Sequence, residues 1–205
     1  MLFHPFFPYF SCSVLPLSRI LHLNRQPEHM HDETELLHQA KNGSHTAFRE
    51  LYDAHVSPLF RFLKQFSSDR DEVQDWVQRA FIKAYERIDT FDQRSRFSSW
   101  LFRIGINEMK MDRRRELTAP VIPSVEEMEV SVQAVDDFHW NEVMGGWLYE
   151  LDTIKRMVFM LYEVEGYSHA EIASMLNIGE STSRSILSRT KQWLKDKWHN
   201  EEKSV

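Results

Sequence analysis

Apolar residues recur at steps of three and four through residues 32–115 and 140–198, and this spacing predicts two groups of helices. The clearest stripe has eight apolar members: Val73, Trp76, Val77, Ala80, Phe81, Ala84, Tyr85 and Ile88. We expect helices over about 32–41, 45–66, 71–88 and 100–115 in the first group. The second group is expected to hold helices over 140–151, 153–164, 169–176 and 181–198.

Capping residues stand where these stripes begin. Asp32, Ser44, Asp152 and Ser168 each precede an apolar run, and Ser168 is followed by Glu171 at the spacing of a capping box. A turn at residues 177–179 separates a short helix from a longer one, which is the plan of a helix-turn-helix. The outward face of the longer helix would then present polar and basic side chains to a major groove: Arg184, Ser185, Ser188, Arg189 and Gln192.

Charge divides the chain into parts. Residues 116–139 contain six acidic residues, no Lys or Arg and no Gly, whereas the helical blocks on either side are nearly neutral. We therefore expect an all-α protein with a first domain over 30–115, an acidic linker over 116–139 and a helix-turn-helix domain over 140–205. The net charge of −6 would argue against nucleic-acid binding, but the linker alone accounts for it.

The N-terminal residues differ from the rest of the chain. Residues 1–29 are rich in aromatic residues and prolines, and we expect them to be a disordered extension or sequence upstream of a true start at Met30. No apolar run is long enough for a transmembrane helix, so membrane insertion is not expected. The single cysteine, Cys12, excludes a disulfide scaffold and a cysteine-based zinc site.

Two basic segments lie beside aromatic residues in the first block. Arg94 and Arg96 fall in a polar loop, and Arg113–Arg115 end the fourth predicted helix. Basic and aromatic side chains together suit single-stranded DNA, because cations track the backbone and rings stack on bases. An arginine run at a helix end also simply favours the helix dipole, so charge alone does not decide between the two readings.

Three motifs, in order, resemble those of bacterial extracytoplasmic-function sigma factors of the sigma-70 family. The first runs from Asp75 through Gln78 to Tyr85, and the second from Phe97 through Trp100 and Arg103 to Asn107, with Asp112-Arg-Arg after it. The third joins the Glu165–Ala173 segment to the Glu180–Arg189 segment.

The resemblance implies a promoter-specificity subunit of RNA polymerase that is not an enzyme and needs no cofactor or metal. It places core-polymerase binding at Asp75, Gln78 and Arg79. It places recognition and melting of the minus-10 element at Arg94, Arg96, Phe97, Trp100, Arg103 and Asn107. It places minus-35 recognition at Thr182, Arg184, Ser185, Ser188 and Arg189. The expected partners are core RNA polymerase, promoter DNA and an anti-sigma factor, all in the cytoplasm.

Three positions depart from the family pattern. Arg79 stands where Glu is usual, Ser183 where Val is usual, and Ile186 where Arg is usual. The change at Arg79 puts a polymerase contact in question. The change at Ser183 affects the packing of the recognition helix, and the change at Ile186 removes a phosphate contact that is usual in the family.

Two other classes of protein share parts of this pattern or composition. A LuxR-type regulator would share the C-terminal helix-turn-helix but would need no motif like that of residues 71–115. An enzyme would need a catalytic or metal-binding motif, and the ten histidines do not fall at metal-ligand spacings.

Overall fold

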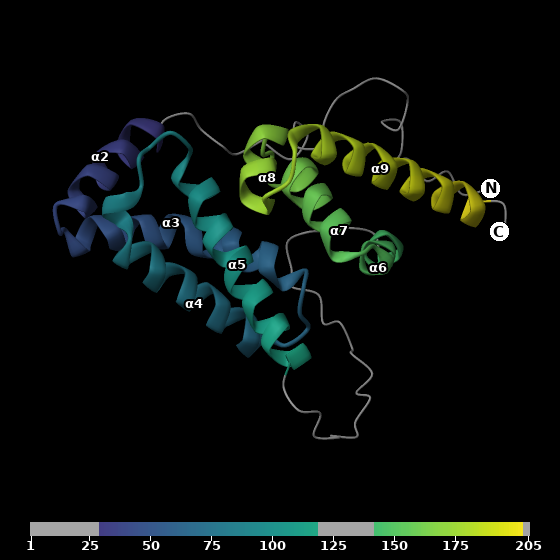
Figure 1. Ribbon diagram of the computed structural model, residues 1–205, viewed down its shortest axis with the longest axis horizontal. Coiled ribbons are helices and arrows are strands. Elements are labelled where there is room, and N and C mark those ends of the chain that lie inside the picture. Colours follow the sequence, from purple (N-terminus) through teal and green to yellow (C-terminus); the bar gives the residue numbers. More distant parts are fainter. Residues whose placement is uncertain (1–28, 119–141, 203–205) are drawn as a thin grey trace, which may run out of the picture.

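The computed structural model describes residues 29–118 and 142–202, and every regular element in these ranges is helical (Figure 1). The first domain contains α2 (His29–Lys41), α3 (His45–Lys64), α4 (Arg70–Glu86), the short η1 (Ile88–Thr90) and α5 (Phe97–Thr118). The second contains α6 (Glu142–Glu150), α7 (Thr153–Phe159), the π-helical turn η2 (Met160–Val164), α8 (His169–Leu176) and α9 (Glu180–Glu202). The predicted all-α class with two helical domains is therefore confirmed.

Side-chain caps fix most helix starts where the sequence predicted them. The Ser44 hydroxyl accepts a hydrogen bond from the Ala47 amide at 3.2 Å, and the Asp152 carboxylate accepts from the Lys155 amide at 3.1 Å. Ser168 and Glu171 form the complete capping box of α8. One start differs, since α2 already begins at His29 and the predicted cap Asp32 lies inside it.

The boundaries of α5 also differ from the prediction. This helix begins at Phe97, three residues before the predicted start at Trp100, and it continues to Thr118. The Arg96 carbonyl accepts from the Trp100 amide at 3.2 Å, so Arg96 stands at the point where the loop enters the helix. The first three residues of the predicted linker thus belong to α5, and the rest of the linker up to residue 139 lies outside the described residues, as do residues 1–28.

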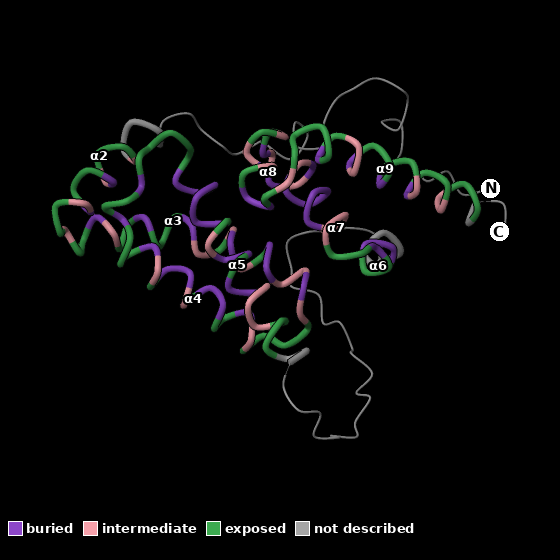
Figure 2. Tube along the Cα trace, in the orientation of Figure 1, coloured by how far each residue is buried: buried purple, intermediate pink, exposed green. Residues whose placement is uncertain are grey.

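Helices α3, α4 and α5 enclose the core of the first domain (Figure 2). Trp76, Phe62 and Leu101 are almost fully buried there. Gly105 permits the close approach of α5 to α3, because a Cβ atom at this position would lie 3.0 Å from a methyl group of Leu59. This packing fixes which face of α5 points outward.

The second domain is built around the helix-turn-helix of α8 and α9. Ile172 and Leu176 from α8 are buried, as are Leu187 and Leu194 from α9. Asn177 adopts the left-handed conformation (φ 56°) that the tight turn requires. No helix in the described ranges has both the length and the apolar character needed to cross a membrane.

Candidate nucleic-acid interface

The exposed face of α9 is narrow and polar at its centre and basic at its edges. With 100° between successive residues of a helix, Ser185, Ser188 and Gln192 fall near the middle of this face. Arg184 lies toward one edge and Arg189 toward the other, and both are exposed. Two central serines with arginines on both flanks allow a helix to enter a groove and reach both of its walls.

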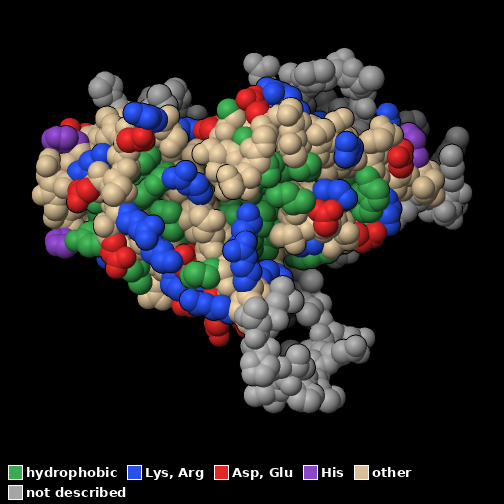
Figure 3. All heavy atoms as spheres, in the orientation of Figure 1, with side chains coloured by type: hydrophobic (Ala, Val, Ile, Leu, Met, Phe, Trp, Pro, Cys, Tyr) green, Lys and Arg blue, Asp and Glu red, His purple; other side chains and the backbone are tan. Residues whose placement is uncertain are grey.

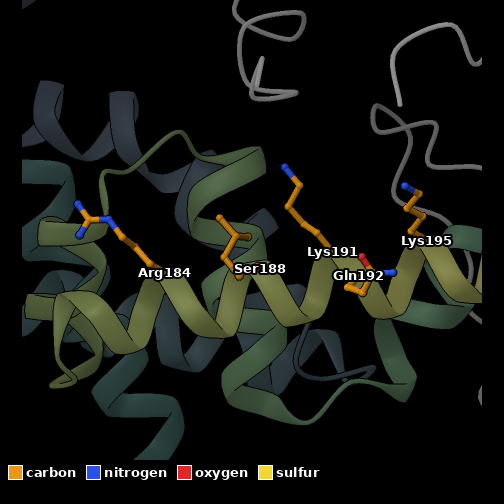
Figure 4. A pocket seen from close by; sticks show the side chains of 6 residues that line it. Arg184, Ser188, Lys191, Gln192 and Lys195 are labelled. Atoms are coloured by element: carbon orange, nitrogen blue, oxygen red, sulfur yellow. The ribbon is translucent and has the colours of Figure 1, made fainter. Parts of the chain in front are cut away.

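Two lysines extend this surface beyond the residues that the sequence analysis selected. Lys191 and Lys195 line a shallow depression along α9 together with Arg184, Ser188 and Gln192 (Figure 4). Their spacing from Arg184, seven and then four residues, places the three cations along one edge of the helix. That spacing is visible in the sequence and could have identified them. Lys191 also donates to Glu163 Oε1 at 2.9 Å.

Both residues of α9 that depart from the family pattern, Ser183 and Ile186, lie on the inner side of the helix. Ser183 is fully buried, and its hydroxyl lies 2.9 Å from Nδ1 of His169 on α8. The His169 ring in turn stacks on Tyr162 at 4.5 Å between centroids. Burial and the nearby Arg184 charge lower the pKa of His169, which favours the neutral ring in this contact. Ile186 is half-buried and packs against the core, so it belongs to the inner side of the helix.

A second polar and basic line runs along α5. Arg103, Asn107, Lys110 and Arg114 recur at steps of four, three and four, which places them in one row on the surface of the helix. Arg103, Asn107 and Arg114 are exposed, and Lys110 is half-buried. Lys and Arg side chains cross the face of the molecule over α4 and α5 (Figure 3). The α5 row therefore contains two predicted minus-10 residues and two further cations.

Lys110 lies beside another cation of this row, Arg114. Burial and the positive charge of Arg114 both lower the pKa of Lys110. A bound phosphate beside these two cations would relieve their mutual repulsion.

The aromatic residues predicted for the minus-10 site are buried in this structure. Phe97 is 1% exposed and Trp100 is 8% exposed. The Phe97 ring lies 5.3 Å from that of His55 and 5.9 Å from that of Phe91. These rings anchor the loop to the core, so the groups presented outward are Arg94, Arg103 and Asn107. Arg94 is 88% exposed, with Asp92 as its ion-pair partner.

Arg96 is exposed, but its side chain also contacts the second domain. Its guanidinium group makes a two-pronged contact with the carboxylate of Glu171 in the second domain. The predicted minus-10 loop is thus joined to the helix-turn-helix by an ion pair that sequence patterns gave no means to predict.

The outer face of α4 carries the residues predicted to bind polymerase. Asp75 and Gln78 are exposed, and Ile82 follows them on the same face with 49% of its surface exposed. A single exposed apolar residue is common on a protein surface, and Ile82 is of interest because it lies on the same face as Asp75 and Gln78. The sequence motifs alone gave no role to Ile82.

Arg79 points toward α5 instead. Its guanidinium group contacts Asp112 and also lies within 3.7 Å of Glu108 and 3.3 Å of Asp75. Trp76 Nε1 donates to Asp112 at 2.9 Å, and Lys83 pairs with Glu108. Arg79 therefore joins α4 to α5. The positive charge of this unusual residue is balanced by the carboxylates of Glu108 and Asp112 on α5.

We expect Asp112→Ala to lower the free energy of unfolding by about 2–3 kcal/mol, because it removes the acceptor of a buried indole and a partly buried guanidinium. Burial raises the pKa of Asp112, but hydrogen bonds from Arg79 and Trp76 lower it below 3.8 overall. This contribution is therefore present above pH 3.8 and is lost as the pH falls through the folded-state value. Urea denaturation at several pH values measures both effects.

Asp53→Ala is the control for that measurement. Asp53 forms an exposed pair with Arg49 on α3, and the loss is expected to be under about 0.5 kcal/mol. Equal losses for the two variants would contradict the role given to Asp112.

Metal binding finds no support within residues 29–118 and 142–202. No three His, Cys, Asp or Glu side chains in these ranges come close enough together to hold a metal ion.

Comparison with known proteins gives matches over both domains. Residues 51–117 match the family model for sigma-70 region 2, and residues 148–194 match that for sigma-70 region 4. Together the two matches cover more than half of the chain. A LuxR-type regulator would not account for the first match.

Two sigma factors are similar to this chain over most of its length. The ECF RNA polymerase sigma factor SigM of Bacillus subtilis is 28% identical over 151 residues, which cover 71% of this chain and 91% of SigM. The RNA polymerase sigma factor CnrH of Cupriavidus metallidurans is 29% identical over 153 residues, which cover 68% and 80% of the two chains.

Two solved structures are similar in fold. CnrH in complex with the cytosolic domain of CnrY aligns with a TM-score of 0.61 and 26% identity, over 82% of this chain and 97% of CnrH. The sigma factor RpoE of Bartonella quintana, in complex with the anti-sigma factor NepR, aligns with a TM-score of 0.58 and 25% identity, over 73% and 94%.

Proposed function

This chain belongs to the extracytoplasmic-function group of the sigma-70 family, and we propose that its two exposed basic faces divide promoter recognition between them. As a sigma factor it binds core RNA polymerase and directs transcription initiation. The α9 face would read the minus-35 duplex, and the α5 row with Arg94 would hold the melted minus-10 strand. The observation that carries this division is that the α9 face and the α5 row each align several cations and belong to different, separately matched domains.

The chemistry of each face suits its task. On α9, Arg184 and Arg189 flank small hydroxyl side chains, which lets arginine reach guanine edges or phosphates in a major groove. On α5, the amide of Asn107 can both donate to and accept from the edge of an unpaired base, while the flanking cations hold the backbone. Duplex contacts would set the register, and captured bases would keep the strands apart.

Lys110 and Arg114 extend this role beyond the residues selected from the sequence. They continue the row of Arg103 and Asn107 toward the C-terminal end of α5. We assign them to backbone phosphates rather than bases, because long cationic side chains beside one another neutralise charge without reading sequence.

The polymerase surface would be the outer face of α4, formed by Asp75, Gln78 and Ile82. Arg79 would support this face from behind through Asp112 and would not contact polymerase itself. This arrangement explains how the chain tolerates Arg at a position where Glu is usual. The chain would act together with polymerase in the cytoplasm. Polymerase would carry out the chemical steps of transcription.

An anti-sigma factor would complete the set of partners. The support is that a similar solved structure is that of a sigma factor bound to an anti-sigma factor. The stimulus that would release this chain has no signature among the described residues.

The direct test is transcription in vitro from genomic DNA by core RNA polymerase with the full-length chain. We expect a small set of new start sites whose upstream sequences share one pair of motifs. Folded protein that neither binds polymerase nor produces new starts would overturn the proposal.

Replacing Ile82 with Glu should weaken binding to core polymerase about tenfold or more, because it places a charge at the apolar centre of the α4 face. Thr153→Glu adds the same charge at the start of α7 in the other domain and should have little effect. Fluorescence anisotropy of the labelled chain with core polymerase measures both. Unchanged affinity for Ile82→Glu would remove α4 from the interface.

A further inference from the structure

An ion pair between the two domains lies at the N-terminal end of the α5 row. Arg96 Nε and Nη2 donate to the two carboxylate oxygens of Glu171 at 2.8 and 3.0 Å. The Ser99 hydroxyl donates to the same carboxylate at 3.0 Å. The Arg96 guanidinium also lies over the Tyr167 ring, 4.9 Å from its centroid. Glu171 therefore gathers two polar groups of the first domain around one carboxylate.

The same carboxylate also serves its own domain. The Ser168 amide and hydroxyl each donate to Glu171 Oε2 at 2.8 Å, which forms the cap of α8. Burial raises the pKa of Glu171, but hydrogen bonds from Arg96 and Ser168 outweigh it and lower the pKa to about 2. The group is thus ionised and surrounded by donors, as a bound phosphate oxygen would be.

The position of this contact matters for DNA binding. Arg96 and Ser99 precede Arg103 by seven and four residues, so they continue the row of Asn107, Lys110 and Arg114 to its N-terminal end. In a helix-turn-helix, the first helix crosses the DNA backbone while the second enters the groove. The contact thus joins the start of one predicted phosphate-binding row to the backbone-facing helix of the other domain.

The rest of the interdomain contact reinforces the closed arrangement. Phe102 of α5 meets the buried Tyr167 edge-on at 5.4 Å, and α8 packs beside α5 (Figure 1). Beyond these rings, Arg156 of α7 donates to the Gln65 carbonyl at 2.9 Å and lies over the Phe66 ring. One arginine from each domain thus reaches an oxygen atom of the other.

We propose that Glu171 is an intramolecular latch whose carboxylate occupies the place of a DNA phosphate at Arg96 and Ser99, so that the free chain inhibits its own DNA binding. The inhibition part rests on the proposed function, whereas the latch itself rests on the contact alone. DNA or polymerase would favour the open form by competing for Arg96 or by separating the domains.

Glu171→Gln isolates the latch from the cap. Glutamine can still accept from Ser168, as it does in other capping boxes, but it carries no charge for Arg96. Arg156→Gln weakens the other side of the contact, and Arg156 has no assigned role in DNA binding. Glu150→Gln is the matched control, because it also removes an ion pair of a glutamate, with Lys197, but one that lies within the second domain.

Two measurements on the full-length chain test the proposal. Spin labels at the exposed Gln74 on α4 and Thr153 on α7, with Cys12 replaced by Ser, report the distance between domains. Binding of a fluorescent single-stranded 20-mer of mixed sequence at low salt reports access to phosphate-binding groups. We expect Glu171→Gln and Arg156→Gln to give longer, broader distances and about tenfold tighter DNA binding, and Glu150→Gln to match the unmodified chain.

The possible results separate the latch from the proposed function. Unchanged distances in a folded Glu171→Gln chain would overturn the latch, whatever DNA binding does. Longer distances without tighter binding of the 20-mer would overturn self-inhibition. Failure of the unmodified chain to produce new transcripts with polymerase would instead count against the proposed function and leave the distance result to decide on the latch.

Discussion

Asn107→Ala will reduce open-complex formation about 30-fold, because it removes an amide that can bind the edge of an unpaired base. Asn107 is exposed in the middle of the α5 row, between Arg103 and Lys110. The cations around it remain in the variant, so attraction to the DNA backbone is kept. The loss should therefore fall on melting and not on the first encounter with promoter duplex.

Permanganate footprinting of the melted region, with gel-shift binding at low temperature as the measure of duplex contact, separates these two steps. Asn42→Ala is the control, since Asn42 is an exposed amide at the end of α2, away from the α5 row. Equal losses in melting and in duplex binding would show that Asn107 contacts the duplex, and its assignment to the unpaired strand would then be wrong.

Local signals predicted most of the helices. Capping at Ser44, Asp152 and Ser168 is encoded within four residues of each helix start, and the structure confirms all three. The α5 start was missed for a related reason. Its N-terminal turn contains Phe97 and two serines, which look like a loop in the sequence but are buried in the fold.

The sites were predicted less completely than the fold. The row of Arg103 and Asn107 could have been extended to Lys110 and Arg114 by spacing alone. Burial of Phe97 and Trp100 could not be read in that way, because an aromatic residue at a helix start can face the core or the solvent. The packing of Phe91, which follows η1, against α5 decides it, with the ring centroids of Phe91 and Trp100 5.2 Å apart.

Contacts between residues far apart in the sequence could not be predicted from the spacing of apolar and polar residues. Arg96 and Glu171 each belong to a motif with its own local explanation, a basic loop and a capping box. Nothing in either motif indicates that the two groups meet. The same holds for Ser183 and His169, where a hydrogen bond inside the helix-turn-helix replaces the apolar contact expected at that position.

The double variant Arg184→Ala, Arg189→Ala should lower transcription from promoters that depend on a minus-35 element about a hundredfold, since each arginine contact with DNA contributes roughly 1–3 kcal/mol. The two residues flank the exposed ridge of α9, so their combined loss removes contacts to both sides of a groove. Glu180 forms an ion pair with Arg184 in the free chain, which holds that guanidinium near the N-terminal end of the helix where base contacts are made.

Lys195→Ala is the informative comparison, because it removes a charge from the same helix at a position nearer its C-terminal end and leaves the pair of Lys191 with Glu163 intact. Lys195 suits a phosphate contact, so its loss should weaken binding to all sequences alike and reduce its salt dependence. The arginine variant should instead change which promoters are chosen, as measured by sequencing transcripts from genomic DNA. If both variants weakened all promoters equally, α9 would be a general backbone-binding helix, and sequence selection would have to come from the α5 face.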